Sequence, residues 1–320
     1  MKQTFRPSVL LQFNAAVTVF CVMLVMVWSS AIGFYLPEFS TVLPMYIVAG
    51  MFLLAGLFYA FVRVDDRVAR AMLSITIMQV FISTSGVLSY LGATLKFPMA
   101  DPMFVAIDRA MGFDWIAMVH WAQDKPVMIE VLKFFYDKPF SVLPFCIMML
   151  LIFTNRGDRF EELVGFVVIS TSLTLIIGSM IPGISAFAYF DIPADISAKI
   201  GTSLDHSSGQ AYFDIRNGID NKIDLNNPRA LIALPSYHTV VAVMLSLYVR
   251  HNRWLLAAMI PVSAGVVLST PLIGGHYLID TLAGIALAFF AFWLVRKLAR
   301  MSATVPAQQP SLGAAEPVAG

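Results

Sequence analysis

Eight apolar runs constrain the fold of this chain more than any other feature. A helix needs about 20 mainly apolar residues to cross the hydrocarbon core of a bilayer. Only 13% of the 320 residues are charged, against roughly 25% in soluble domains. The sequence therefore predicts an all-α polytopic membrane protein with about eight transmembrane helices, at about residues 9–36, 42–62, 71–95, 139–154, 163–182, 236–249, 255–273 and 277–295.

The segments between these runs are informative because the polar residues gather there. Residues 96–138 interleave Trp and Phe with charges, which predicts helices that lie in the membrane interface rather than cross it. Residues 183–234 form the longest polar stretch. The run at 236–249 is shorter than a full span, so either it begins below the membrane surface or its first turn is shielded by protein. Both alternatives place His238 in a recess.

Basic residues occupy alternate short loops, which predicts an orientation by the positive-inside rule. With eight spans, both termini are expected in the cytoplasm of a bacterium with the protein in its inner membrane. Residues 183–234, His238 and His276 are then expected on the periplasmic side. The basic residues that carry this prediction are Lys2, Arg6, Arg63, Arg67, Arg70, Arg156, Arg159, Arg250, Arg253, Arg296, Lys297 and Arg300.

His276 and Asp280 are four residues apart at the start of the last run. In a helix this spacing places both side chains on one face. The carboxylate can accept the N–H of one ring nitrogen and leave the other as a nucleophile or base. A local hydrogen bond without catalytic meaning is the alternative, although ionisable groups within a membrane are more often functional.

A second histidine lies in a second motif, Pro235-Ser-Tyr-His238, at the start of the sixth run. A helix N-terminal cap beside an uninvolved histidine is the alternative interpretation. Both helices begin on the same predicted side, and helix N-termini bind anions, above all phosphate. We therefore expect His276 to attack phosphorus, Asp280 to hold its tautomer and His238 to protonate the departing oxygen. Phosphate is expected to contact Ser236, Tyr237 and Gly275.

The two histidine motifs, 235–238 and 269–280, resemble the second and third signature motifs of the type-2 phosphatidic acid phosphatase superfamily. Segments 108–115, 213–218 and 274–280 are similar to its branch that includes inositol phosphorylceramide synthases. The resemblance implies a six-helix core, a membrane-embedded triad of His238, His276 and Asp280, and a phosphohistidine intermediate. The acceptor, either water or a lipid or polyol hydroxyl, stays open.

This resemblance organises the chain into three parts. Residues 1–95 are expected to be N-terminal transmembrane helices, residues 96–300 the catalytic membrane domain, and residues 301–320 a disordered tail. The substrates are expected to be membrane lipids at the outer leaflet, with no cofactor, no metal and no nucleic acid. The net charge of +1 gives no sign of a nucleic-acid partner.

The chain departs from the superfamily pattern in its cations. Thr270 stands where the phosphatases usually have Arg, and their first motif, a Lys and an Arg-Pro pair, is not evident. We expect Arg216, then Lys138, to neutralise phosphate, with solvated loop charges or headgroup anchors as the alternative. The missing Arg favours a transferase over a phosphatase.

The sequence is also compatible with functions other than that of an enzyme. A lipid or small-molecule transporter would place polar residues along its pathway, and a structural scaffold would need neither histidine. A metal bound by the triad is disfavoured because no further ligand is near in sequence. Cys21 and Cys146 are not spaced as metal ligands and are expected to be small buried hydrophobic residues.

Overall fold

The computed structural model describes residues 5–154, 156–202, 204, 206–223 and 231–303. Within these residues the chain forms thirteen helices and no strand longer than an isolated bridge. Seven helices are long and apolar enough to cross a membrane. The all-α polytopic prediction is therefore confirmed. The seven helices are α1 (Val9–Ile32), α2 (Phe39–Phe61), α3 (Asp66–Ala93), α6 (Pro126–Phe153), α7 (Gly157–Met180), α12 (Arg253–Ile273) and α13 (Leu278–Ala303).

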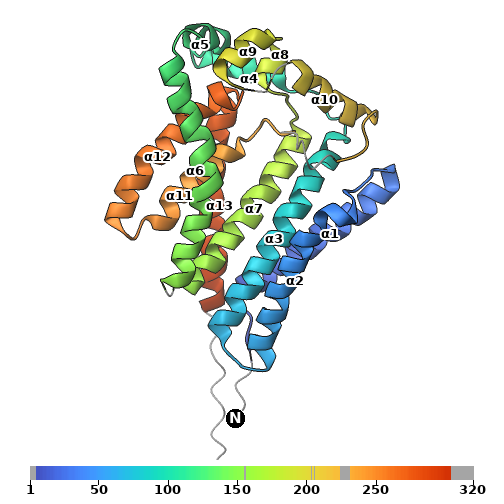
Figure 1. The fold of residues 1–320 in the computed structure, drawn as a ribbon, viewed down its shortest axis with the longest axis vertical. Coiled ribbons are helices and arrows are strands. Elements are labelled where there is room, and N and C mark those ends of the chain that lie inside the picture. The colour runs from blue at the N-terminus through green and yellow to red at the C-terminus, as the bar shows by residue number, and fades with distance from the viewer. Residues whose placement is uncertain (1–4, 155, 203, 205, 224–230, 304–320) are drawn as a thin grey trace, which may run out of the picture.

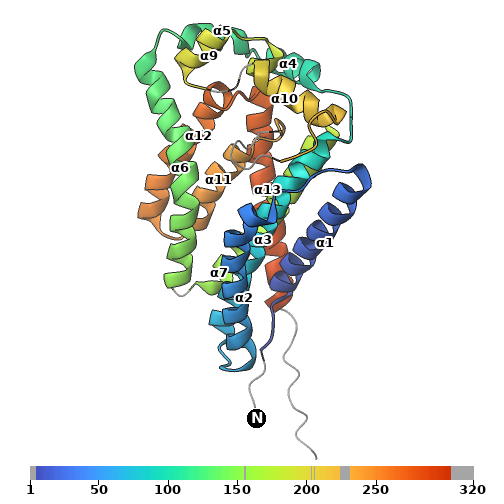
Figure 2. The same ribbon diagram turned by 45° about the vertical axis from the view of Figure 1, so that its right-hand side comes forward.

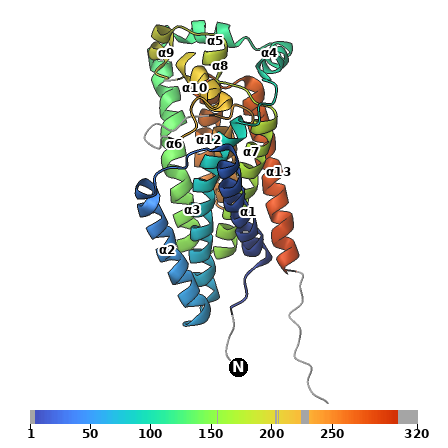
Figure 3. The same cartoon turned by 90° about the vertical axis from the view of Figure 1, so that its right-hand side faces the viewer.

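The long helices run side by side, and short helices gather at one end of them (Figures 1 and 2). We call this the short-helix end. The beginning of α1 and the end of α13 lie at the opposite end (Figure 3). This arrangement agrees with the predicted pattern of basic loops, because the strongly basic short loops all lie at the end opposite the short helices. The short helices are α4 (Asp101–Ala110), α5 (Trp115–Ala122), α8 (Ala186–Tyr189), α9 (Ala194–Ile200) and α10 (His206–Asn217).

The predicted short run is α11 (Tyr237–Val249), an apolar helix of 13 residues. It packs against α12, α13 and α6. Ser236 and Thr239 in its first turn are fully buried. The helix therefore starts within the protein rather than at its surface, as its length predicts.

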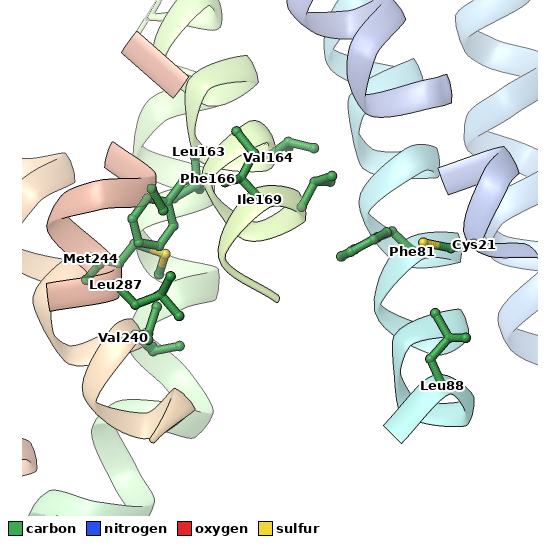
Figure 4. Close-up of a cluster of buried hydrophobic side chains, with 14 of the residues drawn as sticks. Cys21, Phe81, Leu88, Leu163, Val164, Phe166, Ile169, Val240, Met244 and Leu287 are labelled. Carbon is green, nitrogen blue, oxygen red and sulfur yellow. The ribbon is translucent and has the colours of Figure 1, made fainter. Parts of the chain in front are cut away.

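The apolar core lies around α7, which contacts α3, α13, α11 and α1. Figure 4 shows Phe166 of α7 beside Met244 of α11 and Leu287 of α13. Because the three helices pack directly, the starts of α11 and α13 are held at fixed positions. Cys21 is buried in the same cluster, as expected. Cys146 is exposed on α6, so its predicted burial was wrong.

Two boundaries also differ from the sequence prediction. α6 begins at Pro126 and continues through Pro139 and Pro144, so the last part of the predicted interfacial region belongs to a long helix. The charges of this part did not end the helix because Lys138 and Glu130 point outward. Residues 301–303 end α13, and the remainder of the predicted disordered tail lies outside the described residues.

Candidate active site

The two histidine motifs meet where α11 begins against the first turn of α13. The backbone N–H of Ser236 donates to the carbonyl of Asp280 at 3.0 Å. Gly284, one turn further along α13, permits this approach, because a Cβ there would lie 2.6 Å from the Ser236 carbonyl oxygen. Two segments far apart in the chain are thus joined through their backbones.

His238 and His276 line one cavity of about 550 Å³. Its walls come from α3, α6, α7 and α11 and from the loops at the short-helix end. Volumes of this order suit small-molecule sites. The polar side chains that line it, besides the two histidines, are Ser85, Ser89, Tyr136, Asp137, Thr171, Thr174, Ser185, Thr202 and Tyr237.

His276 is paired with Asp280 as the spacing predicts. Its Nδ1 lies 3.3 Å from Asp280 Oδ2, which also accepts the backbone N–H of Tyr277 at 3.0 Å. Asp280 is fully buried. A neutral imidazole held in this way carries its proton on Nδ1, so Nε2 keeps a free lone pair. The pair therefore presents a nucleophilic nitrogen.

His238 is held by aromatic side chains that the sequence analysis did not identify. Its Nδ1 lies 3.1 Å from the hydroxyl of Tyr136. Its ring stacks on Tyr136 and lies beside Phe140, with centroid separations of 4.1 and 4.2 Å. No local pattern marks these contacts, because α6 and α11 are about 100 residues apart in the chain.

Two carboxylates of α4 brace the segment that carries His276. Asp108 accepts the backbone N–H groups of Leu278 and Ile279 at 2.8 and 2.9 Å. Asp101 accepts the hydroxyl of Tyr277 and the backbone N–H of Ile184, each at 3.0 Å. Burial raises the pKa of both aspartates, and the hydrogen bonds from the backbone oppose this rise.

These contacts correct one expectation about phosphate. The first N–H groups of α13 donate to Asp108 and Asp280, so this helix start does not offer them to an anion. The start of α11 differs, since the backbone N–H groups of Tyr237, His238 and Thr239 have no acceptor among the described residues. An anion site at a helix start is therefore consistent with α11 alone.

The expected phosphate contacts divide into two groups. Tyr237 and Gly275 line the cavity, and Gly275 has the positive φ of 63° that its turn requires. Ser236 is buried outside the cavity lining, and its hydroxyl has no partner among the described residues.

Neither predicted cation lines the cavity. Arg216 donates to the carbonyl of Phe97 at 2.7 Å, and Lys138 is exposed on α6. Asp137, the neighbour of Lys138, lines the cavity instead. Among the described residues that line it there is no Lys or Arg.

Thr270, which replaces the usual Arg, is also directed elsewhere. It is fully buried, and its hydroxyl donates to the carbonyl of Val266 in its own helix at 2.8 Å. Within the described chain, no group of three or more His, Cys, Asp or Glu side chains could hold a metal ion.

The fold and the site together define a class: a polytopic helical membrane protein in which two histidines line one cavity and a buried carboxylate is paired with one of them. The sequence model of the PAP2 superfamily matches residues 102–294, more than half of the chain, and the chain belongs to this superfamily. The match includes His238, His276 and Asp280. Comparison with curated proteins and with solved structures gave no match. The narrower resemblance to inositol phosphorylceramide synthases stays a prediction.

Proposed function

We propose that this protein is a membrane lipid phosphatase or phosphotransferase that works through a phosphohistidine on His276. The observation that carries the proposal is the His276–Asp280 pair, which faces the cavity that His238 also lines. Membership of the PAP2 superfamily supports phosphatase-type chemistry. His238, His276 and Asp280 are the proposed triad.

The reaction has two steps that balance. First, Nε2 of His276 attacks phosphorus, a P–N bond forms, the P–O bond to the leaving group breaks, and imidazolium His238 gives that oxygen a proton. Then water or an alcohol attacks phosphorus, the P–N bond breaks, and His238 takes the proton of the attacking oxygen. Asp280 stabilises the positive charge that His276 carries in the intermediate.

The side chains that line the cavity suggest which molecule can accept the phosphoryl group. No Lys or Arg lines it among the described residues, while Asp137 and several hydroxyl groups do. The start of α11 supplies the dipole and N–H groups that can stabilise a phosphate oxygen. Hydroxyl-rich walls suit an alcohol acceptor as well as water, which is why we keep transfer beside hydrolysis.

The orientation follows from the basic loops. We place both termini in the cytoplasm of a bacterial cell and the short-helix end at the outer leaflet of the inner membrane. Three walls of the cavity come from α3, α6 and α7, which are long apolar helices whose surfaces can accompany lipid chains. The partners of the protein in this proposal are therefore membrane lipids.

Purified protein should be incubated with a panel of phospholipids, with and without diacylglycerol, ceramide or inositol as acceptors. Mass spectrometry separates hydrolysis from transfer. Wild-type protein should consume at least one phosphate ester, and His276→Ala should consume none while keeping its fold. A transporter would cleave no ester and would lose only flux in the variant. Absence of cleavage across the panel would reject the enzyme.

A further inference from the structure

We propose that Tyr136 is a positioning residue for His238, and this inference rests on the proposed function. In this proposal the Tyr136 hydroxyl, 3.1 Å from Nδ1 of His238, is the acceptor of the N–H on that nitrogen. Nε2 is then the nitrogen that exchanges a proton with the reacting oxygen. The step that depends on Tyr136 is protonation of the leaving group in the first half-reaction.

The ring of His238 is enclosed by one face of α6. Tyr136 and Phe140 are four residues apart, so both project from the same side of the helix. Tyr136 is nearly parallel to the imidazole, at an interplanar angle of 18°, and Phe140 is tilted by 31°. The two rings therefore restrict rotation of the imidazole.

In this proposal both histidines are held through the same ring nitrogen. Nδ1 of His276 is held by Asp280, and Nδ1 of His238 is held by Tyr136, at 3.3 and 3.1 Å. In each ring the nitrogen left for the substrate is Nε2. The partners differ in charge: the carboxylate suits a group that becomes cationic when phosphorylated, whereas the neutral phenol lets His238 lose its proton.

The Tyr136 hydroxyl also touches the segment that carries the nucleophile. A Cβ added to Gly274 would lie 2.7 Å from that hydroxyl oxygen, so Tyr136 occupies space that only a glycine leaves open. Gly274 is two residues before His276. The Tyr136 side chain therefore fills the space beside the segment that carries His276.

Proton balance requires the tautomer that Tyr136 stabilises. Imidazolium His238 carries protons on both nitrogens, and the proton on Nε2 moves to the leaving oxygen. The neutral ring then keeps its proton on Nδ1, bound to the Tyr136 hydroxyl, and Nε2 can accept a proton from water or an alcohol in the second step. Without the hydroxyl, the ring can rotate or change tautomer, and Nε2 is no longer fixed on the substrate.

The test compares leaving groups in Tyr136→Phe, which keeps the stacked ring and removes only the hydroxyl. Phosphatidic acid has an alkoxide leaving group that needs a proton, whereas 4-nitrophenyl phosphate has one that leaves without it. The pre-steady-state release of the first equivalent of alcohol or nitrophenol reports on the first step alone. We expect Tyr136→Phe to slow this release about 10- to 100-fold for phosphatidic acid and less than about 3-fold for 4-nitrophenyl phosphate.

Tyr248→Phe is the matched control, because it removes a buried hydroxyl that donates to the carbonyl of Glu162, far from the cavity. It should leave both rates unchanged. Tyr136→Leu, which also lacks the hydroxyl, should show the same selective loss if Tyr136→Phe does not fold. Equal loss with both substrates, or no loss, would overturn the role of Tyr136. Absence of any turnover in the wild type would instead reject the proposed function.

Discussion

The carboxylate of Asp108 lies 2.8 Å from the backbone nitrogen of Leu278, 170 residues later in the chain. With its second bond, to Ile279, it caps α13 from another helix. The first turn of α13 carries Asp280, and His276 lies just before it. The position of the proposed nucleophile is therefore fixed by α4 as well as by the helix that follows it.

Asp108→Ala should lower both stability and activity. It leaves two N–H groups without an acceptor and removes a negative charge from a helix N-terminus, which costs about 1–2 kcal/mol. The first turn of α13 should then loosen, and phosphate-ester turnover should fall more than about 10-fold. Thermal unfolding in detergent and product formation are the measurements. Asp108→Asn keeps a hydrogen-bond acceptor, so its stability and activity should lie between those of the wild type and of Asp108→Ala.

Asp65→Ala provides the matched control for Asp108. Asp65 caps α3 through the N–H groups of Arg67 and Val68, far from the cavity. Asp65→Ala should lose about as much stability as Asp108→Ala but keep its activity. Equal loss of activity in both variants would show that general destabilisation, rather than the placement of α13, is responsible.

Asp280→Asn should abolish most of the activity with little change in fold. The amide has nearly the same shape but no charge, and it can present its NH₂ group to His276 and so favour the wrong tautomer. We expect a loss in kcat on the order of 10³-fold or more, as for the equivalent change in a serine protease triad. Steady-state kinetics on purified protein measure it, and a loss below about 10-fold would contradict the proposed pairing.

The contacts that could be predicted from the sequence are local ones. The bond between His276 and Asp280 follows from four-residue spacing, because one helical turn determines it. The buried start of α11 follows from the length of its apolar run. The motifs at 235–238 and 269–280 also indicated that His238 and His276 would share one cavity.

The missed contacts depend on how helices pack. Tyr136 and Asp108 meet partners 102 and 170 residues away, and no spacing within either segment encodes that distance. Lys138, which was predicted to neutralise phosphate, does not line the cavity for a related reason. Each residue turns a helix by about 100°, so Asp137 and Lys138 face different sides once α6 is a continuous helix.

Treatment with EDTA should leave the activity unchanged. The proposed chemistry uses nitrogen as nucleophile and imidazole as acid, so it needs no metal-bound water. Turnover should be compared before and after dialysis against the chelator, and again after adding Mg²⁺ or Zn²⁺. Loss of activity that either metal restores would contradict the two-histidine mechanism.

Gly284→Ala should separate α11 from α13. The added methyl would lie 2.6 Å from the carbonyl oxygen of Ser236, which is backbone and cannot rotate away. We expect a loss of about 1–3 kcal/mol in stability and a larger loss in kcat, because His238 and Asp280 lie on the two helices that must move. Thermal unfolding and steady-state kinetics measure these effects.

Gly50→Ala is the control for this change. Gly50 lies in α2, and a Cβ there would meet nothing within 4 Å. Alanine is the better helix former by about 1 kcal/mol, so this variant should be as stable as the wild type or more so. If Gly284→Ala behaves like Gly50→Ala, the close crossing of α11 and α13 is not needed for the site.

Cysteine labelling tests the orientation separately from the chemistry. Ser207 is exposed in α10 at the short-helix end, and His251 is exposed in the basic turn between α11 and α12 at the opposite end. In a background without Cys21 and Cys146, a membrane-impermeant maleimide should label Ser207→Cys in intact cells and His251→Cys only after permeabilisation. The positive-inside rule gives this order, since Arg250 and Arg253 flank His251. The reverse order would move the cavity to the cytoplasmic leaflet while leaving the proposed reaction of His276 unaffected.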